Sequence, residues 1–246
     1  MGKTNLYDQK YYEEYEYGFS AEERLDHKRI LELLKIKPID KALEIGCGLG
    51  VLLTKIPSKK KMGIETNDFA IRECCKKGLS VIKADTEKRL PFRDSSFDTI
   101  IMNEVLEHLR DPQFVLKECF RILTPRGKIA LTTPVRNFFV HDLAETHFSE
   151  MTTKELRELV EKYGFKILNH EVSGISFLYP LMENLFFRPF RFLRDFLKRK
   201  QGKKAVKLID SCHGLADRTF LKPLSFYRRH FLGFGANQLI LAEKKD

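Results

Sequence analysis

The stretch ALEIGCGLG, residues 42–50, joins a short apolar segment to three glycines, Gly46, Gly48 and Gly50. The apolar part predicts a buried strand over 41–45, and the apolar residues after Gly50 predict that a helix begins there. Glycines let the backbone turn tightly between the two elements and let a ligand approach the backbone closely. The first turn of the helix adds free N–H groups. The stretch therefore predicts a ligand-binding turn at the carboxyl end of a strand.

Short apolar segments alternate with helical segments along the rest of the chain. Strands are predicted at 61–65, 79–85, 97–103, 127–134, 165–172 and 237–245. A helix is expected after Asn67, another after the cap formed by Asp111 and Pro112, and a third after the capping box at 152–155. A further capping box, at 20–23, predicts a helix that ends near Ile36. This alternation indicates an α/β fold with a doubly wound, Rossmann-like and mainly parallel sheet covered on both faces.

Two carboxylates follow the next two predicted strands. Glu65 ends the second strand, about twenty residues after the glycine turn, where a carboxylate can accept both hydroxyls of a ribose. Asp85 ends the third strand, where it can accept from the amino group of an adenine. The carboxyl ends of parallel strands form the crevice in which doubly wound sheets bind their ligands. The sequence therefore predicts a nucleoside site there.

The charge near the glycines distinguishes between two kinds of nucleoside. In a dinucleotide fingerprint, G-x-G-x-x-G, the helix N-terminus holds a pyrophosphate, but here the third glycine comes one residue early. Glu44, two residues before Gly46, would repel a pyrophosphate. It would suit a ligand that carries a positive ammonium or sulfonium group. The pattern therefore favours S-adenosylmethionine over NAD.

Four further blocks of sequence extend this pattern. They are GIETND (63–68), ADTEKRLPFRDSSFDTIIMNEVLEHLRDP (84–112), LKECFRILTPRGKIALTTP (116–134) and HFSEMTTKELRELVEKYGF (147–165). With the glycine turn, the chain over roughly 40–170 resembles the class I S-adenosylmethionine-dependent methyltransferases. The nearest subgroup includes the ubiquinone- and menaquinone-biosynthesis enzymes and many glycan-cluster methyltransferases.

The resemblance implies a seven-stranded sheet with an antiparallel last strand, and S-adenosylmethionine as cofactor with S-adenosylhomocysteine as product. It also implies roles for particular residues. The methionine end of the cofactor would contact Glu44, Gly46, Cys47 and Gly48. The ribose and adenine would be held by Glu65, Thr66, Asp85 and Thr86, and the floor near the sulfonium would be formed by Asn103 and Glu104.

The sequence at the end of the fourth strand, NEVLEH (103–108), indicates which class of molecule accepts the methyl group. The resemblance would lead one to expect an Asn/Asp-Pro-Pro-aromatic motif there in enzymes that methylate base amines or protein amides. We therefore expect a small-molecule acceptor, methylated at oxygen or at an activated carbon. The candidate general bases are His108, His141 and His147, with plain loop polarity as the alternative. No metal site is predicted.

The positive charge of the chain is concentrated in one region. The chain of 246 residues has a formal net charge of +10, and the segment 185–230 holds 13 basic and 3 acidic residues. This excess of ten accounts for the whole net charge, and it indicates a localised anionic partner. On a helical wheel, 185–199 separates its phenylalanines and leucines, apart from Phe187, from its arginines and lysines, and Pro189 must kink the helix or begin it. Three interpretations stay open: a lid over the acceptor site, a helix on an anionic membrane, and RNA binding, which no RNA-binding motif supports.

These patterns predict one methyltransferase domain with an insertion. The N-terminal part, 1–40, would be a tyrosine-rich arm and a helix; 41–172 with 236–246 would be the cofactor-binding core; and 173–235 would be the basic amphipathic helical insertion. The polar N-terminus, the lack of an apolar run of roughly 18 residues and five cysteines without a C-x-x-C pair predict free thiols and a cytoplasmic location, with peripheral contact at the inner face of the membrane. Alternatives are an RNA methyltransferase and a non-catalytic cofactor-binding module.

Overall fold

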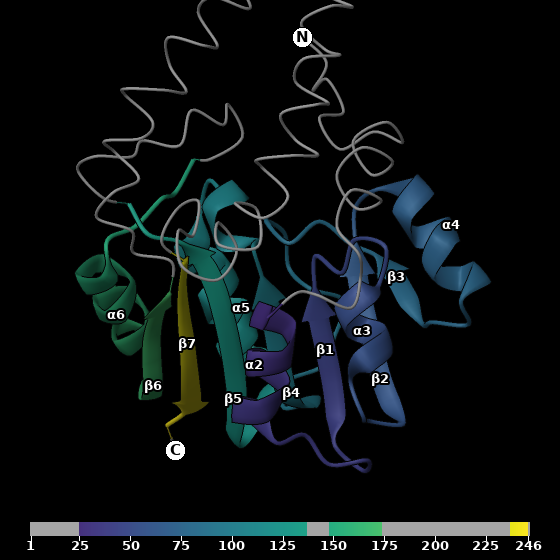
Figure 1. Ribbon diagram of the computed structural model, residues 1–246, viewed down its shortest axis with the longest axis horizontal. Helices are drawn as coiled ribbons and strands as arrows, with labels where there is room; N and C mark the ends of the chain where they lie inside the picture. Colours follow the sequence, from purple (N-terminus) through teal and green to yellow (C-terminus); the bar gives the residue numbers. More distant parts are fainter. Residues whose placement is uncertain (1–24, 137–147, 174–236, 246) are drawn as a thin grey trace, which may run out of the picture. The chain divides into compact units, whose positions relative to one another are not determined.

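The seven strands form a single sheet in the order β3-β2-β1-β4-β5-β7-β6 (Figure 1). The structure is a computed structural model, and it describes residues 25–136, 148–173 and 237–245. The strands are β1 (Lys41–Ile45), β2 (Lys60–Glu65), β3 (Val81–Lys83), β4 (Phe97–Asn103), β5 (Leu123–Pro134), β6 (Phe165–Ser173) and β7 (Asn237–Lys244). The helices are α2 (Leu25–Leu34), α3 (Val51–Lys55), α4 (Asp68–Lys76), the 3-10 turn η1 (Leu106–His108), α5 (Pro112–Ile122) and α6 (Thr153–Lys162).

The sheet is parallel from β3 to β5, and β7 runs in the opposite direction. Backbone pairing is parallel between β1 and β2, β1 and β4, β2 and β3, and β4 and β5. The arrow of β7 points against the arrow of β5 in Figure 1. The strand order reverses between β1 and β4, because β2 lies on one side of β1 and β4 on the other. In open α/β sheets, ligands bind at such a reversal, beside the carboxyl ends of the strands.

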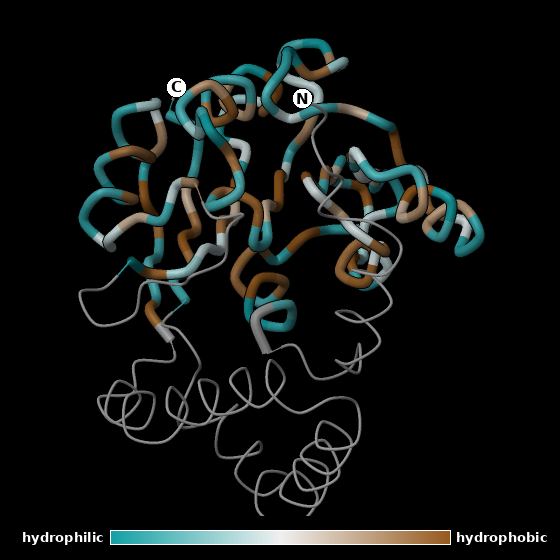
Figure 2. The backbone as a smooth tube through the Cα atoms, turned by 90° about the horizontal axis from the view of Figure 1, so that it is seen from above, coloured by the Kyte–Doolittle hydropathy of each residue, from teal (hydrophilic) through white to brown (hydrophobic). Residues whose placement is uncertain are grey.

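Each face of the sheet is covered by its own hydrophobic layer. On one face, residues of β1, β4 and β5 pack with α5 and α6 in a cluster that includes Leu43, Leu116 and Leu156. On the other face, Ile30 and Leu34 of α2 pack with residues of α3, α4 and the sheet. Figure 2 shows the matching pattern, in which hydrophobic and hydrophilic residues occur together within the turns of the outer helices. Burial of one side of each helix therefore fixes the three-layer arrangement.

The strands and caps expected from the sequence are confirmed in the described residues. Asp111 caps α5 by accepting from the Phe114 N–H at 2.9 Å. Thr152 and Glu155 form the expected capping box of α6. Three elements differ from their predicted ranges by two or more residues at one or both ends. Strand β3 covers only 81–83, and β5 already begins at residue 123. Helix α2 ends at residue 34, because Lys35 adopts a left-handed φ of 50°.

Several expected features lie outside the described residues. They are the tyrosine-rich arm with the capping box at 20–23, the loop 137–147, and the insertion up to residue 236. Apart from residues 172, 173 and 237, the described residues belong to one compact unit. Its four cysteines, Cys47, Cys74, Cys75 and Cys119, are free thiols. Within the described ranges, none of the helices combines the length and the apolarity that crossing a membrane would require.

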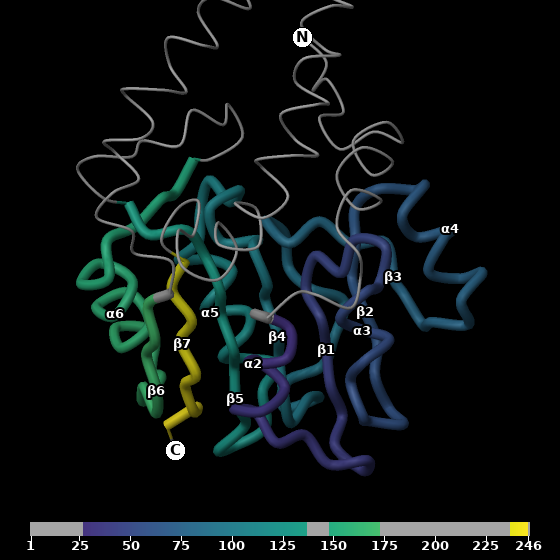
Figure 3. The backbone as a smooth tube through the Cα atoms, in the orientation of Figure 1, coloured from purple at the N-terminus to yellow at the C-terminus, as the bar shows by residue number. Residues whose placement is uncertain are grey.

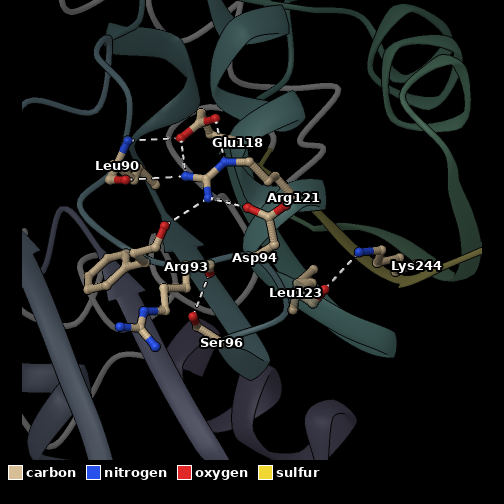
Figure 4. A network of polar contacts seen from close by, with 9 residues as sticks. Leu90, Arg93, Asp94, Ser96, Glu118, Arg121, Leu123 and Lys244 are labelled. Atoms are coloured by element: carbon tan, nitrogen blue, oxygen red, sulfur yellow. Dashed lines mark hydrogen bonds and ion pairs between the residues drawn. The ribbon is translucent and has the colours of Figure 1, made fainter.

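A cluster of polar contacts fastens the loop before β4 to helix α5 (Figure 4). The Arg121 guanidinium donates to Glu118, to Asp94 at 2.8 Å and to the carbonyl oxygens of Leu90 and Phe92. The Glu118 carboxylate also accepts from the Leu90 N–H at 2.8 Å. The hydrogen bonds from Arg121 lower the pKa of Glu118, with burial opposing the shift. This cluster lies where β4 and β5 begin, at the edge of the sheet opposite to the carboxyl ends of the strands.

Candidate functional site

The glycine turn lies between β1 and α3 and is tied to β2. The N–H groups of Gly46 and Cys47 both donate to the Ile64 carbonyl, at 2.9 and 3.2 Å. Gly46 has a φ of 68°, and a Cβ there would lie 2.6 Å from a methyl group of Val105. Both the backbone angle and the space therefore require glycine at this position. The expected strand–turn–helix arrangement is confirmed.

Glu65 connects the end of β2 to the glycine turn. Its Oε2 accepts from the Gly48 N–H at 3.0 Å, and its Oε1 accepts from the N–H groups of Thr66 and Asn67 at 2.7 and 3.0 Å. The residue is only 8% exposed. A carboxylate offers about four acceptor sites, so Oε2 can accept from a second donor, such as a ribose hydroxyl. The geometry fits the nucleoside site that the sequence predicts at this strand end.

Asp85 and Thr86 follow β3, the neighbour of β2. The Asp85 Oδ1 accepts from the Glu87 N–H at 3.0 Å, and its Oδ2 lies 3.5 Å from the Lys88 Nζ. Both residues are partly exposed, so they are accessible to a ligand. Glu65 and Asp85 therefore stand at adjacent ends of paired parallel strands, as the sequence predicts.

Asn103 and Glu104 stand at the end of β4, across the reversal point from β1. The Asn103 Oδ1 accepts from the Thr132 hydroxyl at 2.8 Å, and the Glu104 N–H donates to the same hydroxyl at 3.0 Å. Glu104 has a left-handed φ of 54°, a conformation that non-glycine residues rarely adopt and that clusters at functional sites. The structure thus brings Asn103 and Glu104 to the same edge of the sheet as the glycine turn.

Glu44 and Cys47 are buried beside the turn. Glu44 lies within β1 and is 4% exposed. A hydrogen bond with Cys74, together with burial and the charge of Glu44, raises the pKa of the Cys47 thiol far above its ordinary value. A thiol that stays protonated is a poor nucleophile. Cys47 can therefore line a cofactor site, but it is not suited to attack a substrate.

Of the three candidate bases, only His108 lies within the described residues. His108 ends the turn η1, and its Nε2 lies 3.9 Å from the Glu107 Oε1. His141 and His147 lie outside the described residues. No group of three or more metal-ligating side chains occurs among the residues that the structure describes.

Two buried polar residues near this edge were not identified as site residues from the sequence. His27 of α2 is 2% exposed, and its ring Nε2 lies 3.3 Å from the Asn103 Nδ2. Glu107 of η1 is 1% exposed and accepts from the Thr133 hydroxyl at 3.1 Å. No pattern in the sequence points to His27, because its partner lies 76 residues away. Glu107 falls within the NEVLEH stretch at the end of the fourth strand, and this position could have indicated it as a site residue.

The family of the chain follows from comparison with known proteins. The family model described as methionine biosynthesis protein MetW matches residues 24–169, which hold the glycine turn, the strands β1 to β5 and the first part of β6. The chain belongs to the MetW family. This MetW-family chain has a relative in Methanocaldococcus jannaschii, the uncharacterized protein MJ1123, with 31% identity over 171 residues, 66% of this chain and 82% of the relative.

Other relatives of this MetW-family chain are methyltransferases. The demethylmenaquinone methyltransferase of Lactobacillus johnsonii is 28% identical over 178 residues, covering 56% of this chain and 73% of that protein. A ubiquinone biosynthesis O-methyltransferase of Klebsiella pneumoniae is 29% identical over 105 residues, covering 39% of this chain and 43% of that protein. A solved S-adenosylmethionine-dependent methyltransferase of Thermotoga maritima has 28% identity and a TM-score of 0.55, covering 70% of this chain and 84% of that chain.

Together with the strand order and the glycine turn, these matches establish the enzyme class. The chain is a class I S-adenosylmethionine-dependent methyltransferase with a Rossmann-like fold. The resemblance inferred from its sequence blocks is therefore confirmed, and so are the seven-stranded sheet with an antiparallel β7 and the identity of the cofactor.

Proposed function

We propose that this enzyme transfers the methyl group of S-adenosylmethionine to an oxygen atom of a small, lipophilic acceptor. The observation that supports the site best is the hydrogen bond from the Gly48 N–H to the Glu65 carboxylate. This contact joins the glycine turn to the Glu65 carboxylate at the end of β2, at the edge where the strand order reverses. That is where doubly wound sheets hold nucleosides.

In this proposal, residues at the ends of neighbouring strands bind different parts of the cofactor. Glu65 and Thr66 hold the ribose, and Asp85 with Thr86 holds the adenine. Glu44, Gly46, Cys47 and Gly48 line the methionine end, where the negative charge of Glu44 favours the ammonium and sulfonium groups. Asn103 and Glu104 form the floor near the sulfonium.

The chemistry requires little from the protein beyond placement. S-adenosylmethionine supplies a methyl group that already carries a good leaving group. The residues around it must hold the acceptor oxygen in line with that methyl and exclude water. An acceptor hydroxyl of low acidity also needs a base, for which His108 is the candidate among the described residues. His141 and His147 stay candidates on the sequence alone.

The proposed acceptor class rests on the relatives and on the sequence. Two of the relatives are named for reactions in menaquinone and ubiquinone biosynthesis, the second of them as an O-methyltransferase. Quinones of this kind are lipophilic. The basic, aromatic-rich segment 185–230, which lies outside the described residues, would bring a cytoplasmic enzyme to the inner face of an anionic membrane. As part of the insertion 173–235, it would also cover the acceptor site as a lid.

One labelling experiment tests the acceptor class. Purified full-length protein, S-adenosylmethionine with a labelled methyl group and a cell extract are incubated, and the products are separated into lipid, soluble and RNA fractions. We expect alkali-stable label in the lipid fraction, as a methyl ether. Label only in RNA would contradict the proposed acceptor and support an RNA methyltransferase. No label in any fraction, with the cofactor still bound in calorimetry, would support a non-catalytic cofactor-binding module.

A further inference from the structure

We propose that His27 is a positioning residue for the cofactor site, acting through Asn103. This inference rests on the proposed role of Asn103 beneath the sulfonium. His27 is 2% exposed, and its Nε2 lies 3.3 Å from the Asn103 Nδ2. In the proposed contact the Asn103 amide NH₂ donates, as such a group must, and the ring nitrogen that faces it accepts. This role requires the His27 ring proton to be on Nδ1.

The direction of helix α2 places His27 at this edge of the sheet. In Figure 3, α2 descends towards the end of the sheet at which β1 begins. The helix thus runs against the parallel strands, and its first turn, which holds His27, reaches the carboxyl end of β4. Further along the same helix, Ile30 and Leu34 pack into the hydrophobic layer with Ala130 of β5. The packing of α2 therefore determines where the His27 ring stands.

Asn103 is held from two sides by this arrangement. Its Nδ2 lies 3.3 Å from the His27 Nε2, and its Oδ1 accepts from the Thr132 hydroxyl at 2.8 Å. The Thr132 hydroxyl in turn accepts from the Glu104 N–H at 3.0 Å. One N–H of the amide and one lone pair of its oxygen are left for a ligand. The chain of contacts from α2 through β4 to β5 fixes the direction in which these two groups point.

Two substitutions of similar size separate the hydrogen bond from simple packing. His27→Phe keeps an aromatic ring but removes the acceptor, whereas His27→Gln keeps an acceptor near the position of Nε2. We expect His27→Phe to weaken S-adenosylmethionine binding by roughly 3- to 10-fold, the effect of one lost hydrogen bond. His27→Gln should restore most of the affinity. Isothermal calorimetry with the full-length chain and the cofactor alone measures both.

A spectroscopic measurement tests the same contact without the cofactor. Long-range ¹H–¹⁵N spectra of the imidazole ring report which ring nitrogen carries the proton. We expect the Nδ1–H tautomer for His27 at neutral pH. We also expect the side-chain amide signals of Asn103, assigned from an Asn103→Asp variant, to shift in His27→Phe and to shift less in His27→Gln.

Leu34→Ala is the control for loss of stability. Leu34 is buried at the other end of α2, so this variant should lower the melting temperature and leave the affinity for S-adenosylmethionine unchanged. The inference is overturned if folded His27→Phe binds the cofactor as tightly as the wild type, or if the ring proton resides on Nε2. Wild-type protein that binds no S-adenosylmethionine would instead overturn the proposed cofactor site, and with it the role of His27.

Discussion

Glu107 is a carboxyl group that the fold buries beside the cofactor edge. Its Oε2 accepts from the Thr133 hydroxyl at 3.1 Å, and its backbone carbonyl accepts from the N–H groups of Phe148 and Ser149. Burial, and then the negative charge of Glu104, raise the pKa of this carboxyl well above its ordinary value. The neutral acid is thus the form that the folded protein favours.

Replacing Glu107 by Gln should therefore stabilise the protein as the pH rises. Because the folded state binds the Glu107 proton more tightly than the unfolded state does, wild-type stability falls as the pH rises from the unfolded pKa to the folded pKa. The amide of Glu107→Gln has no proton to lose. We expect the two proteins to melt alike in mild acid and to diverge above it, by up to about 1.4 kcal/mol per pH unit within that window.

Thermal melts of both proteins across a pH series measure this divergence. Glu155→Gln is a control of opposite sign, because hydrogen bonds from Thr152 lower the pKa of Glu155. Its carboxylate stabilises the fold above the unfolded pKa, and this contribution is lost as the pH falls. Parallel stability curves for wild type and Glu107→Gln would show that Glu107 is ionised in the folded protein.

The proposed cofactor site makes a second prediction at the residue scale. Glu65→Gln and Asp85→Asn should each weaken S-adenosylmethionine binding by roughly 10- to 100-fold, since each removes a charged hydrogen-bond acceptor. Asp68→Asn is the matched control. It removes the same charge from the first turn of α4, where Asp68 is exposed and paired with Lys83 at 2.7 Å. Unchanged affinity in both site variants, measured by calorimetry, would refute the assigned site.

At the scale of elements, the contacts around Arg121 hold a long loop in place. One guanidinium binds two carboxylates and two backbone carbonyls at once (Figure 4). A lysine ammonium is a point charge without the forked geometry of arginine. We expect Arg121→Lys to lower the free energy of unfolding by about 2 kcal/mol, because Glu118 then stays buried with a poorer partner. Thermal or urea unfolding measures the loss.

Two comparisons make the Arg121 prediction specific. Arg157→Ala removes an exposed arginine that lies 3.6 Å from Glu161 on α6, and it should change stability by no more than about 0.5 kcal/mol. Arg121→Lys should also leave the affinity for S-adenosylmethionine unchanged, since the Arg121 contacts lie at the edge of the sheet opposite to the proposed cofactor site. A loss of affinity without a loss of stability would contradict this separation.

The elements could be predicted where local sequence decides them. The apolar run before the glycine turn predicts β1, and the caps at Asp111 and Thr152 predict where α5 and α6 begin. The end of α2 could not be placed, because the left-handed φ of Lys35 has no glycine to indicate it. The strand ends with Glu65 and Asp85 were predictable, because parallel strands bring their carboxyl ends together. The contact between His27 and Asn103 could not be predicted, because it depends on how α2 packs across the sheet.

At the scale of the whole molecule, the net positive charge is confined to one region, and the charges of the rest of the chain balance. The segment 185–230 carries 13 basic and 3 acidic residues, and the rest of the chain is electrically neutral overall. A neutral body gives little general attraction to anions, so any attraction to a charged surface should come from this segment. The same segment is rich in phenylalanine, which suits the boundary between lipid head groups and acyl chains. Charge and apolar side chains together would suit an anionic membrane, which is the partner proposed for this segment.

This argument predicts how the full-length protein partitions onto vesicles. The protein should co-sediment with vesicles of phosphatidylglycerol and phosphatidylcholine at low salt, and should not bind phosphatidylcholine alone. Arg188→Gln, Arg191→Gln and Arg194→Gln combined should weaken partitioning on the order of 100-fold, since each basic residue near the surface contributes about 1 kcal/mol. The matched control, Lys28→Gln, Lys154→Gln and Arg157→Gln, removes the same charge from exposed helix positions. Equal losses in both triple variants would mean that net charge alone drives binding, and no binding by the wild type would leave the segment without a membrane role.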